Sequence, residues 1–312
     1  MIEIVKYSEK DKKNWDEFID NAKNGLFMFK RDYMEYHSDR FEDCSLMFFE
    51  KDKLVALLPA NINGTVLYSH QGLTYGSMIL GEKMKQGKML ECFAQLKVFM
   101  KEKGLKKLVY KTIPHIFHTY PSEEDLYALF VNNAKLTKIE PSTIIYLPAP
   151  YNKSTLRNRC LSKAIKSGVI INKSEDFETF IDVLNGVLQE HHHTNAVHTA
   201  EELKLLYSRF PQNIKLYTAN YKDKVIAGCL IFEYETTVHT QYLAADDTAR
   251  EIGGLDLLIK TLIDTYKETK IYFDFGISTE NAGKYLNEGL ISQKEGFGGR
   301  TACYLTWEMN IN

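Results

Sequence analysis

The 312-residue sequence lacks the features that mark several classes of protein. Its five cysteines never form a CxxC pair and lie far apart, at Cys44, Cys92, Cys160, Cys229 and Cys303. This spacing argues against a disulfide framework and against a structural zinc site. No run approaches the roughly 18 apolar residues of a membrane span, and the N-terminal segment has no apolar signal core. We therefore expect a cytoplasmic protein without a membrane span.

An excess of charge is also absent. The chain has 39 lysines and arginines against 41 aspartates and glutamates, a net charge of -2. Its bulk electrostatics therefore give no support to a polyanionic partner such as DNA or tRNA. Hydrophobic residues make up 44% of the chain and charged residues 26%, as in ordinary globular proteins. The length favours two domains.

Proline is scarce, and its clustering marks a linker. Three of the seven prolines fall within the segment Pro141 to Asn152 (PSTIIYLPAPYN), where they block helix propagation. We expect the domain boundary there, between a domain of residues 1–147 and one of residues 148–312.

An approximate internal repeat indicates that the two halves are related. Residues 45–60 and 216–232 both read as strand, charged turn and strand, with the motif KDK at residues 51–53 and 222–224. Each hairpin is followed by a strand, a helix and a further strand. Because this order requires a crossover, the fold class is α/β (α+β), each half a mixed and mostly antiparallel sheet flanked by helices.

The segment Val238 to Asp264 carries the strongest chemical signal. A strand leads into a polar loop that ends in Gly253 and Gly254, and an amphipathic helix follows. Unpaired amides at a helix start lie at the positive end of its dipole and suit a diphosphate. An ordinary strand-loop-helix connection with a glycine-relaxed turn is the structural alternative.

Residues 156–309 resemble the Fem-like branch of the GNAT acyltransferase superfamily. The resemblance rests on the strand HTQYLAA, the loop RxxGG, the strand YFDFGIS and the closing segment of residues 280–300. The N-terminal half looks like a diverged GNAT fold without the loop. The resemblance implies tandem GNAT-like domains, the C-terminal one carrying an acyl-CoA site.

The resemblance also assigns residues to the coenzyme. Ala244 and Ala245 pair with pantetheine through their backbone, and Arg250, Gly253 and Gly254 hold the pyrophosphate. Leu255 departs from the family pattern, which has a small residue in that slot. Ser278 and Asn281 either cap the following helix or face the thioester and the cofactor. The implied co-substrate is acetyl-CoA, or another acyl-CoA, with no metal.

Acyl transfer to an amine requires a base. Strand alternation puts Asp274 near the end of its strand, where it serves as base or orients the acceptor. His193 is the second candidate base, and Tyr242 is a third catalytic candidate. His239 and Gln241 share one face of the preceding strand and Tyr242 takes the other, so each is placed to touch substrate or to form a polar pair on a solvent face.

Two charged segments complete the candidate site. Lys294 and Arg300 bracket KEGFGG and either bind an anionic acceptor or belong to a solvated hairpin. The run of residues 190–193, with His198 nearby, is not expected to bind metal, because consecutive histidines at a helix end point in different directions.

These features predict an N-acyltransferase that moves an acyl group, expected to be acetyl, from acyl-CoA to a small amine. An amino sugar or a nucleotide-linked amino sugar is the first acceptor to test. The alternatives are a Fem-like peptidyltransferase that uses aminoacyl-tRNA, and a non-catalytic GNAT-fold binding protein. DNA is not an expected partner, tRNA enters only under the first alternative, and a homodimer stays open.

Overall fold

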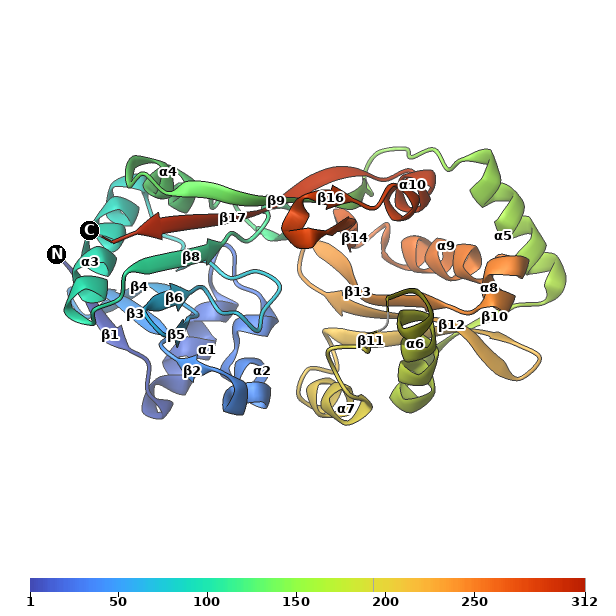
Figure 1. Cartoon of the computed structure of the whole chain (residues 1–312), viewed down its shortest axis with the longest axis horizontal. Helices are drawn as coiled ribbons and strands as arrows, with labels where there is room; N and C mark the ends of the chain where they lie inside the picture. The colour runs from blue at the N-terminus through green and yellow to red at the C-terminus, as the bar shows by residue number, and fades with distance from the viewer. Residues whose placement is uncertain (193, 312) are drawn as a thin grey trace. The chain divides into compact units, whose positions relative to one another are not determined.

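The computed structural model describes residues 1–192 and 194–311, and it divides into two compact units. Unit 1 comprises Met1–Glu140 with Cys303–Asn312, and unit 2 comprises Pro141–Ala302. Both ends of the chain therefore belong to unit 1 (Figure 1). We predicted a domain boundary between residues 147 and 148. The division into compact units does not test where one domain ends and the next begins, so this boundary stays a prediction.

Unit 1 contains two groups of strands and a set of short helices. The first group has the order β1-β3-β4-β7, with bounds Ile2–Lys6, Leu46–Glu50, Lys53–Leu58 and Ile79–Leu80. The second has the order β8-β6-β5-β2, with bounds Lys107–Lys111, Val66–Tyr68, Asn61–Asn63 and Glu42–Asp43. The helices are η1 (Glu9–Asp11), α1 (Lys12–Asp20), η2 (Phe27–Phe29), α2 (Arg31–Met34), η3 (Glu35–Arg40), α3 (Gln86–Glu102), η4 (His115–Phe117) and α4 (Glu124–Val131).

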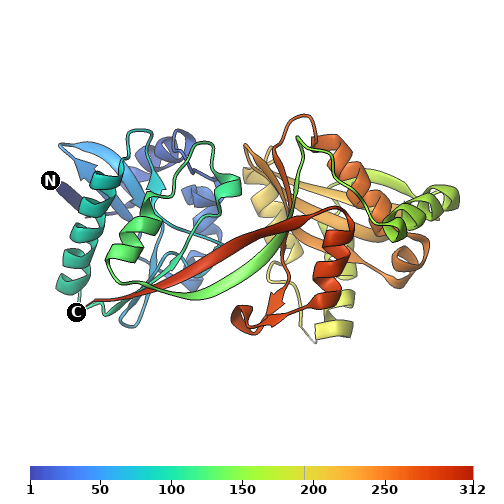
Figure 2. The same cartoon turned by 90° about the horizontal axis from the view of Figure 1, so that it is seen from above.

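The long helix α3 supplies much of the core of unit 1. Its buried residues recur at helical spacing, at Met89, Cys92, Phe93, Leu96 and Met100. They join one hydrophobic cluster with strand residues of both groups. Two long strands, β9 (Lys135–Tyr146) and β17 (Arg300–Asn310), are neighbours in the sheet order and run side by side in Figure 2.

Unit 2 is built on a continuous run of strands in the order β10-β11-β12-β13-β14. Their bounds are Ile170–Ser174, Ile214–Tyr221, Lys224–Glu233, Thr237–Ala245 and Tyr272–Ile277. A small hairpin follows, formed by β15 (Thr279–Glu280) and β16 (Tyr285–Leu286). The helices are α5 (Thr155–Ser167), α6 (Phe177–His192), α7 (Ala200–Arg209), α8 (Asp247–Ile252), α9 (Gly254–Tyr266), η5 (Asn281–Gly283) and α10 (Glu288–Gly296).

Helices cover both faces of the unit 2 sheet, with α9 and α6 on opposite sides (Figure 1). The α9 residues Leu258 and Leu262 are fully buried in a cluster with Val238 of β13. On the other face, α6 packs closely on β12, because a Cβ at Gly228 would lie 2.4 Å from the Phe180 ring. We call the side of the sheet that packs on α9 the α9 face and the opposite side the α6 face.

The predicted hairpin repeat is present in both units. The turn between β3 and β4 has φ of 48° at Lys51 and 62° at Asp52, and the turn between β11 and β12 has 48° at Lys222 and 63° at Asp223. Two central residues with positive φ form the tight turn that matches the twist of paired strands. Both hairpins also contain a register shift shortly before the turn. After the hairpins the two units differ in strand pairing. The second strand of the hairpin pairs with β13 in unit 2, whereas it pairs with β7 in unit 1.

Candidate active site in unit 2

The strands β13 and β14 separate in the middle of the unit 2 sheet. Their parallel register covers three pairs and ends at His239↔Asp274. From there β13 continues to Ala245 alongside β12, whereas β14 has an irregular register with β9 and a φ of 74° at Gly276. The edge of β13 after His239 is thus turned toward a widening gap, where its backbone amides and carbonyls can meet an extended ligand.

A β-bulge within β13 decides which side chains face that gap. Leu230 lies opposite Tyr242 and Ile231 lies opposite Thr240, which leaves Gln241 as the extra residue. A bulge reverses the alternation of side chains beyond it. Val238 and Ala245 both pack in the α9 cluster, so His239 and Tyr242 share the α6 face. The prediction that Tyr242 lies on the face opposite to His239 was therefore wrong.

His239 and Asp274 form a buried pair at the point of separation. His239 Nδ1 lies 2.7 Å from Asp274 Oδ2, and Asp274 Oδ1 accepts hydrogen bonds from the Ser142 hydroxyl and, at 3.1 Å, from the Gly276 amide. Asp274 is fully buried and His239 is 6% exposed. The carboxylate is thus enclosed by protein and contacts the imidazole. Ser142 lies on β9, remote in sequence, and sequence reasoning missed it.

The carboxylate of Asp274 beside Nδ1 favours the tautomer of His239 that carries its proton on Nδ1. A carboxylate that accepts from Nδ1–H leaves Nε2 as the proton acceptor of the neutral ring. Gly276 makes room for this ring, because a Cβ there would lie 3.4 Å from His239 Cε1. This arrangement suits a general base.

Lys294 and Arg300 lie in different surroundings. Lys294 is buried on α10, and its Nζ donates to the carbonyls of Gly276 at 2.9 Å and Ile277 at 2.7 Å. Burial lowers the pKa of Lys294 to about 8, an effect that Asp274 opposes. Arg300 is exposed and lines a surface pocket with Tyr146. Lys294 therefore holds the end of β14, next to the site, and Arg300 does not join it there.

The remaining predicted substrate and catalytic residues are dispersed. Ser278 is buried and its amide donates to Pro141 O at 3.1 Å, whereas Asn281 is exposed on η5. The Tyr242 hydroxyl lies 2.7 Å from Nδ1 of the buried His198, and burial raises the pKa of Tyr242. His193 lies outside the described residues.

The predicted pyrophosphate turn is closely packed. Arg250 is exposed on α8 and pairs with Asp247 at 3.0 Å. The Gly253 amide donates to Ala249 O at 2.9 Å and ends α8, and Gly253 has a φ of 84°. A Cβ at Gly253 would lie 2.1 Å from the backbone oxygen of Cys160. Glycine is required here because α5 lies against the turn.

A carboxylate of the protein itself lies at the start of α9. Asp256 is buried in the first turn of α9 and forms an ion pair with Arg157 of α5 at 3.0 Å. Burial raises the pKa of Asp256 to about 6, while Arg157 and the amide of Asp256 itself favour the charged form. This carboxylate takes the favourable position for an anion. The turn therefore does not fit a coenzyme diphosphate. Ala244 and Ala245 of β13 pair with β12 on one side, and the other edge of β13 suits an amide-bearing arm.

Comparison with known families identifies the fold around this site. Residues 156–285 match the family model described as an acetyltransferase (GNAT) domain. The matched residues all lie in unit 2. The parallel strands that separate at His239 and Asp274 belong to this domain, and its fold is that of the acyltransferase superfamily. Comparison with curated protein sequences gives no match.

Solved structures extend the likeness to the whole chain. The crystal structure of FemX has a TM-score of 0.70 at 10% identity and covers 99% of this chain and 98% of its own. The L-PGS structure from Bacillus licheniformis has a TM-score of 0.62 at 13% identity, covering 95% of this chain and 90% of its own. A tandem GNAT protein from the clavulanic acid biosynthesis pathway has a TM-score of 0.54 at 11% identity, and the match covers 100% of this chain and 99% of that protein's chain. The predicted Fem-like, tandem GNAT architecture is confirmed.

Within residues 1–192 and 194–311, no group of three or more His, Cys, Asp or Glu side chains converges in a way that could hold a metal ion. None of the helices in these ranges combines the length and apolar character needed to cross a membrane.

Proposed function

We propose that the chain is an N-acyltransferase whose chemical step takes place where β13 and β14 separate. The observation that carries this proposal is the buried pair of His239 and Asp274, 2.7 Å apart, at the last parallel register position of the two strands. A histidine that a carboxylate holds in place is the usual arrangement of a general base. An amine acceptor needs such a base, because its nitrogen must lose a proton on acylation.

The proposed step balances as follows. The acceptor nitrogen attacks the acyl carbonyl carbon, a C–N bond forms, and the bond from that carbon to the oxygen or sulfur of the carrier breaks. His239 Nε2 takes the proton from the nitrogen and returns it to the departing carrier. Amides on the open edge of β13 stabilise the developing oxyanion, and Lys294 keeps the end of β14 in place through the carbonyls of Gly276 and Ile277.

Acetyl-CoA is the first donor to test, with an amino sugar or a nucleotide-linked amino sugar as acceptor. The match to an acetyltransferase domain supports this donor, and so does the free edge of β13, which suits an extended arm. The packed turn at Gly253 does not support it, so no step of the proposed mechanism depends on a diphosphate bound there.

Aminoacyl-tRNA is the second candidate donor, and the packed turn is the observation that favours it. An aminoacyl ester needs no diphosphate at the start of α9. The outer face of α5 carries exposed cations at Arg159, Lys163 and Lys166, which line a surface groove, and Lys163 Nζ donates to Glu251 O of α8 at 2.8 Å. Cations along a groove suit a phosphate backbone.

One assay tests the proposal and separates the donors. The full chain is incubated with labelled acetyl-CoA or with labelled aminoacyl-tRNA, each in the presence of a panel of amino sugars and other amines, and products are identified by mass spectrometry. Transfer that His239→Asn abolishes and that the matched variant His115→Asn, in unit 1, retains supports the proposal. Equal turnover by wild type and His239→Asn would overturn it. Ligand binding without turnover for either donor would instead support a non-catalytic GNAT-fold protein.

A further inference from the structure

Unit 1 contains a second point of strand separation with a histidine beside it. The strands β6 and β8 run parallel for three pairs that end at Tyr68↔Val109. The chain then enters a loop in which the Ser69 amide donates to Val109 O at 2.9 Å and the Ser69 hydroxyl accepts from the Lys111 amide at 2.8 Å. His70 and Lys111 follow directly. In unit 2, His239 and Asp274 are themselves the third and last parallel pair, so both units have a histidine close to the end of a short parallel register, although not at the same position.

His70 combines two unfavourable features. Its φ is 60°, in the left-handed region that non-glycine residues rarely adopt. It is 3% exposed, and in the described part of the chain its buried Nδ1 has no hydrogen-bond partner. Strain and an unsatisfied buried polar atom at one residue need an explanation, and a binding site is one that covers both.

Rings and a glycine surround His70. The His37 ring lies 5.5 Å from the His70 ring and the Phe41 ring lies 5.2 Å from it. The loop residue Gly72 is exposed, and a Cβ there would lie 2.4 Å from His37 Nε2. The imidazole of His37 is therefore buried directly beneath an exposed stretch of backbone without a side chain.

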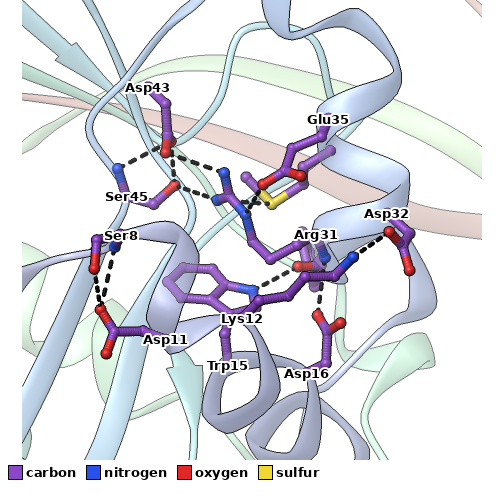
Figure 3. A network of polar contacts seen from close by, with 12 residues as sticks. Ser8, Asp11, Lys12, Trp15, Asp16, Arg31, Asp32, Glu35, Asp43 and Ser45 are labelled. Carbon is purple, nitrogen blue, oxygen red and sulfur yellow. Dashed lines mark hydrogen bonds and ion pairs between the residues drawn. The ribbon is translucent and has the colours of Figure 1, made fainter.

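The elements that carry this centre are held rigidly. His37 Nδ1 lies 2.8 Å from Met34 O, which fixes the ring on η3. Figure 3 shows the polar network of the preceding helix, in which Arg31 at the start of α2 meets Glu35 at 2.9 Å and Asp43 at 3.1 Å. The Arg31 guanidinium also stacks over the Tyr7 ring at 3.8 Å. The charge of Arg31 is thereby matched within its own network.

The loop of His70 is fixed on its other side. The Gln71 amide donates to Asn61 Oδ1 at 2.7 Å, and Asn61 Nδ2 donates to Gln71 Oε1 at 2.8 Å. Lys111 Nζ donates to the carbonyl of Leu73 in the same loop. The loop thus holds its strained residue in one position, as a preformed site requires.

The centre is short of negative charge. Burial lowers the pKa of His70 to about 3, and His37, Lys111 and Arg31 lower it further. Burial lowers the pKa of Lys111 to about 8, with Lys138 acting in the same direction and Glu140 opposing it. Glu140 pairs with Lys138 at 2.7 Å. Within the described chain, no carboxylate forms an ion pair with Lys111.

We propose that His37, His70 and Lys111 form an anion-binding site that takes a phosphate or carboxylate group. Such a group supplies the missing negative charge, and it accepts charge-assisted hydrogen bonds from the Lys111 ammonium and from an imidazole N–H. The site lies within unit 1 and does not depend on acyl transfer in unit 2, so either proposal can fail alone.

Histidine-detected NMR on the full chain tests this site. Long-range ¹H–¹⁵N spectra are recorded during titration with inorganic phosphate, methyl phosphate and acetate, and the two phosphates are compared with the carboxylate. We expect saturable shifts of the His37 and His70 signals. His70→Asn, which keeps a residue tolerant of positive φ, and Lys111→Met should each weaken binding about tenfold or more, because each removes a charge-assisted donor. The matched control is His118→Asn, a half-buried histidine whose Nε2 already meets Ile113 O at 3.0 Å.

The proposal is overturned if none of the three anions gives a saturable change at His37 or His70 in the wild type. It is also overturned if His70→Asn binds with wild-type affinity. Thermal unfolding checks each variant, and if Lys111→Met does not fold, His70→Asn decides the question, since asparagine keeps the backbone conformation of this position.

Discussion

Units 1 and 2 each have a histidine close to the end of a short parallel register, and the neighbours of the two histidines differ in charge. In unit 2 the ring of His239 meets the carboxylate of Asp274. In unit 1 the electrostatic neighbours of His70 are His37, Lys111 and Arg31, all of them basic. The neighbouring side chains therefore distinguish the proposed base in unit 2 from the proposed anion-binding centre in unit 1.

The largest expected effect comes from removing the unit 2 histidine. His239→Asn should lower kcat for acyl transfer by about 10²–10⁴-fold, the usual contribution of a positioned base. The measurement is the initial rate with the donor that the wild type accepts, with His118→Asn in unit 1 as the control. A decrease of less than about threefold, within the scatter of an ordinary surface change, would contradict the contrast between the two histidines.

The carboxylate of unit 2 acts through that histidine. Asp274→Asn preserves the shape of the buried side chain but replaces the oxygen that accepts from His239 Nδ1, so the ring loses its preferred tautomer. We expect kcat to fall by about 10²-fold with KM nearly unchanged, since Asp274 is enclosed by protein and touches no substrate. Steady-state kinetics measure both constants. An increase in KM alone would make Asp274 a binding residue, and circular dichroism controls for folding.

The glycine pair of unit 2 gives the next effect, on stability. Gly253→Ala places a Cβ against the Cys160 backbone at a φ of 84°, whereas a Cβ at Gly254 would lie 3.0 Å from the tip of the Ile226 side chain and 3.3 Å from the Cβ of Ala249. We expect urea unfolding to show a loss of about 2–4 kcal/mol for Gly253→Ala and about 1 kcal/mol or less for Gly254→Ala. Equal stabilities, combined with a specific loss of acetyl-CoA binding by both variants in calorimetry, would restore the turn as a coenzyme site.

Those glycines also show how far the sequence could predict the structure. The KDK turns follow from local chemistry, and they were predicted and are present in both units. The predicted order of one strand and then a helix after the hairpin fits unit 2, whereas unit 1 has three strands, β5, β6 and β7, before α3. The sequence Gly253-Gly254 indicates that something approaches the backbone closely, but it looks the same whether that is a ligand or another helix. The packing partner, Cys160 on α5, lies more than ninety residues away, and its approach is a tertiary event.

The active-site pair shows the same limit. Asp274 was predicted from strand alternation, but its partners Ser142 and His239 depend on which strands are neighbours in the sheet. The bulge at Gln241 reversed the predicted face of Tyr242, because a single extra residue changes the side of every residue after it. The sequence showed a polar residue on each of the two strands, His239 on one and Asp274 on the other. It did not show that the two strands pair in parallel with these residues opposite each other.

Buried carboxylates give the smallest expected effect and extend the contrast to pH. In unit 1 burial raises the pKa of Asp125 to about 7, and the Tyr110 hydroxyl donates to it at 2.8 Å. The folded-state pKa lies above the ordinary value of 3.8, so the folded state keeps this proton where the unfolded chain loses it. The resulting stabilisation is full below about pH 4 and is lost as the pH rises toward 7.

Asp125→Asn should remove this dependence, since the amide stays neutral at every pH. We expect the free energy of unfolding of the wild type to fall by about 1–2 kcal/mol relative to Asp125→Asn between pH 5 and 8. This is less than the full pKa shift of Asp125 would give, because the unfolded chain keeps some residual structure. Urea unfolding at pH 5, 6, 7 and 8 measures the difference, and the exposed Asp182 of α6 supplies the control variant Asp182→Asn. A difference that stays constant across this range would show that Asp125 is ionised in the folded unit, and the buried acid of unit 1 would then need a cation near it.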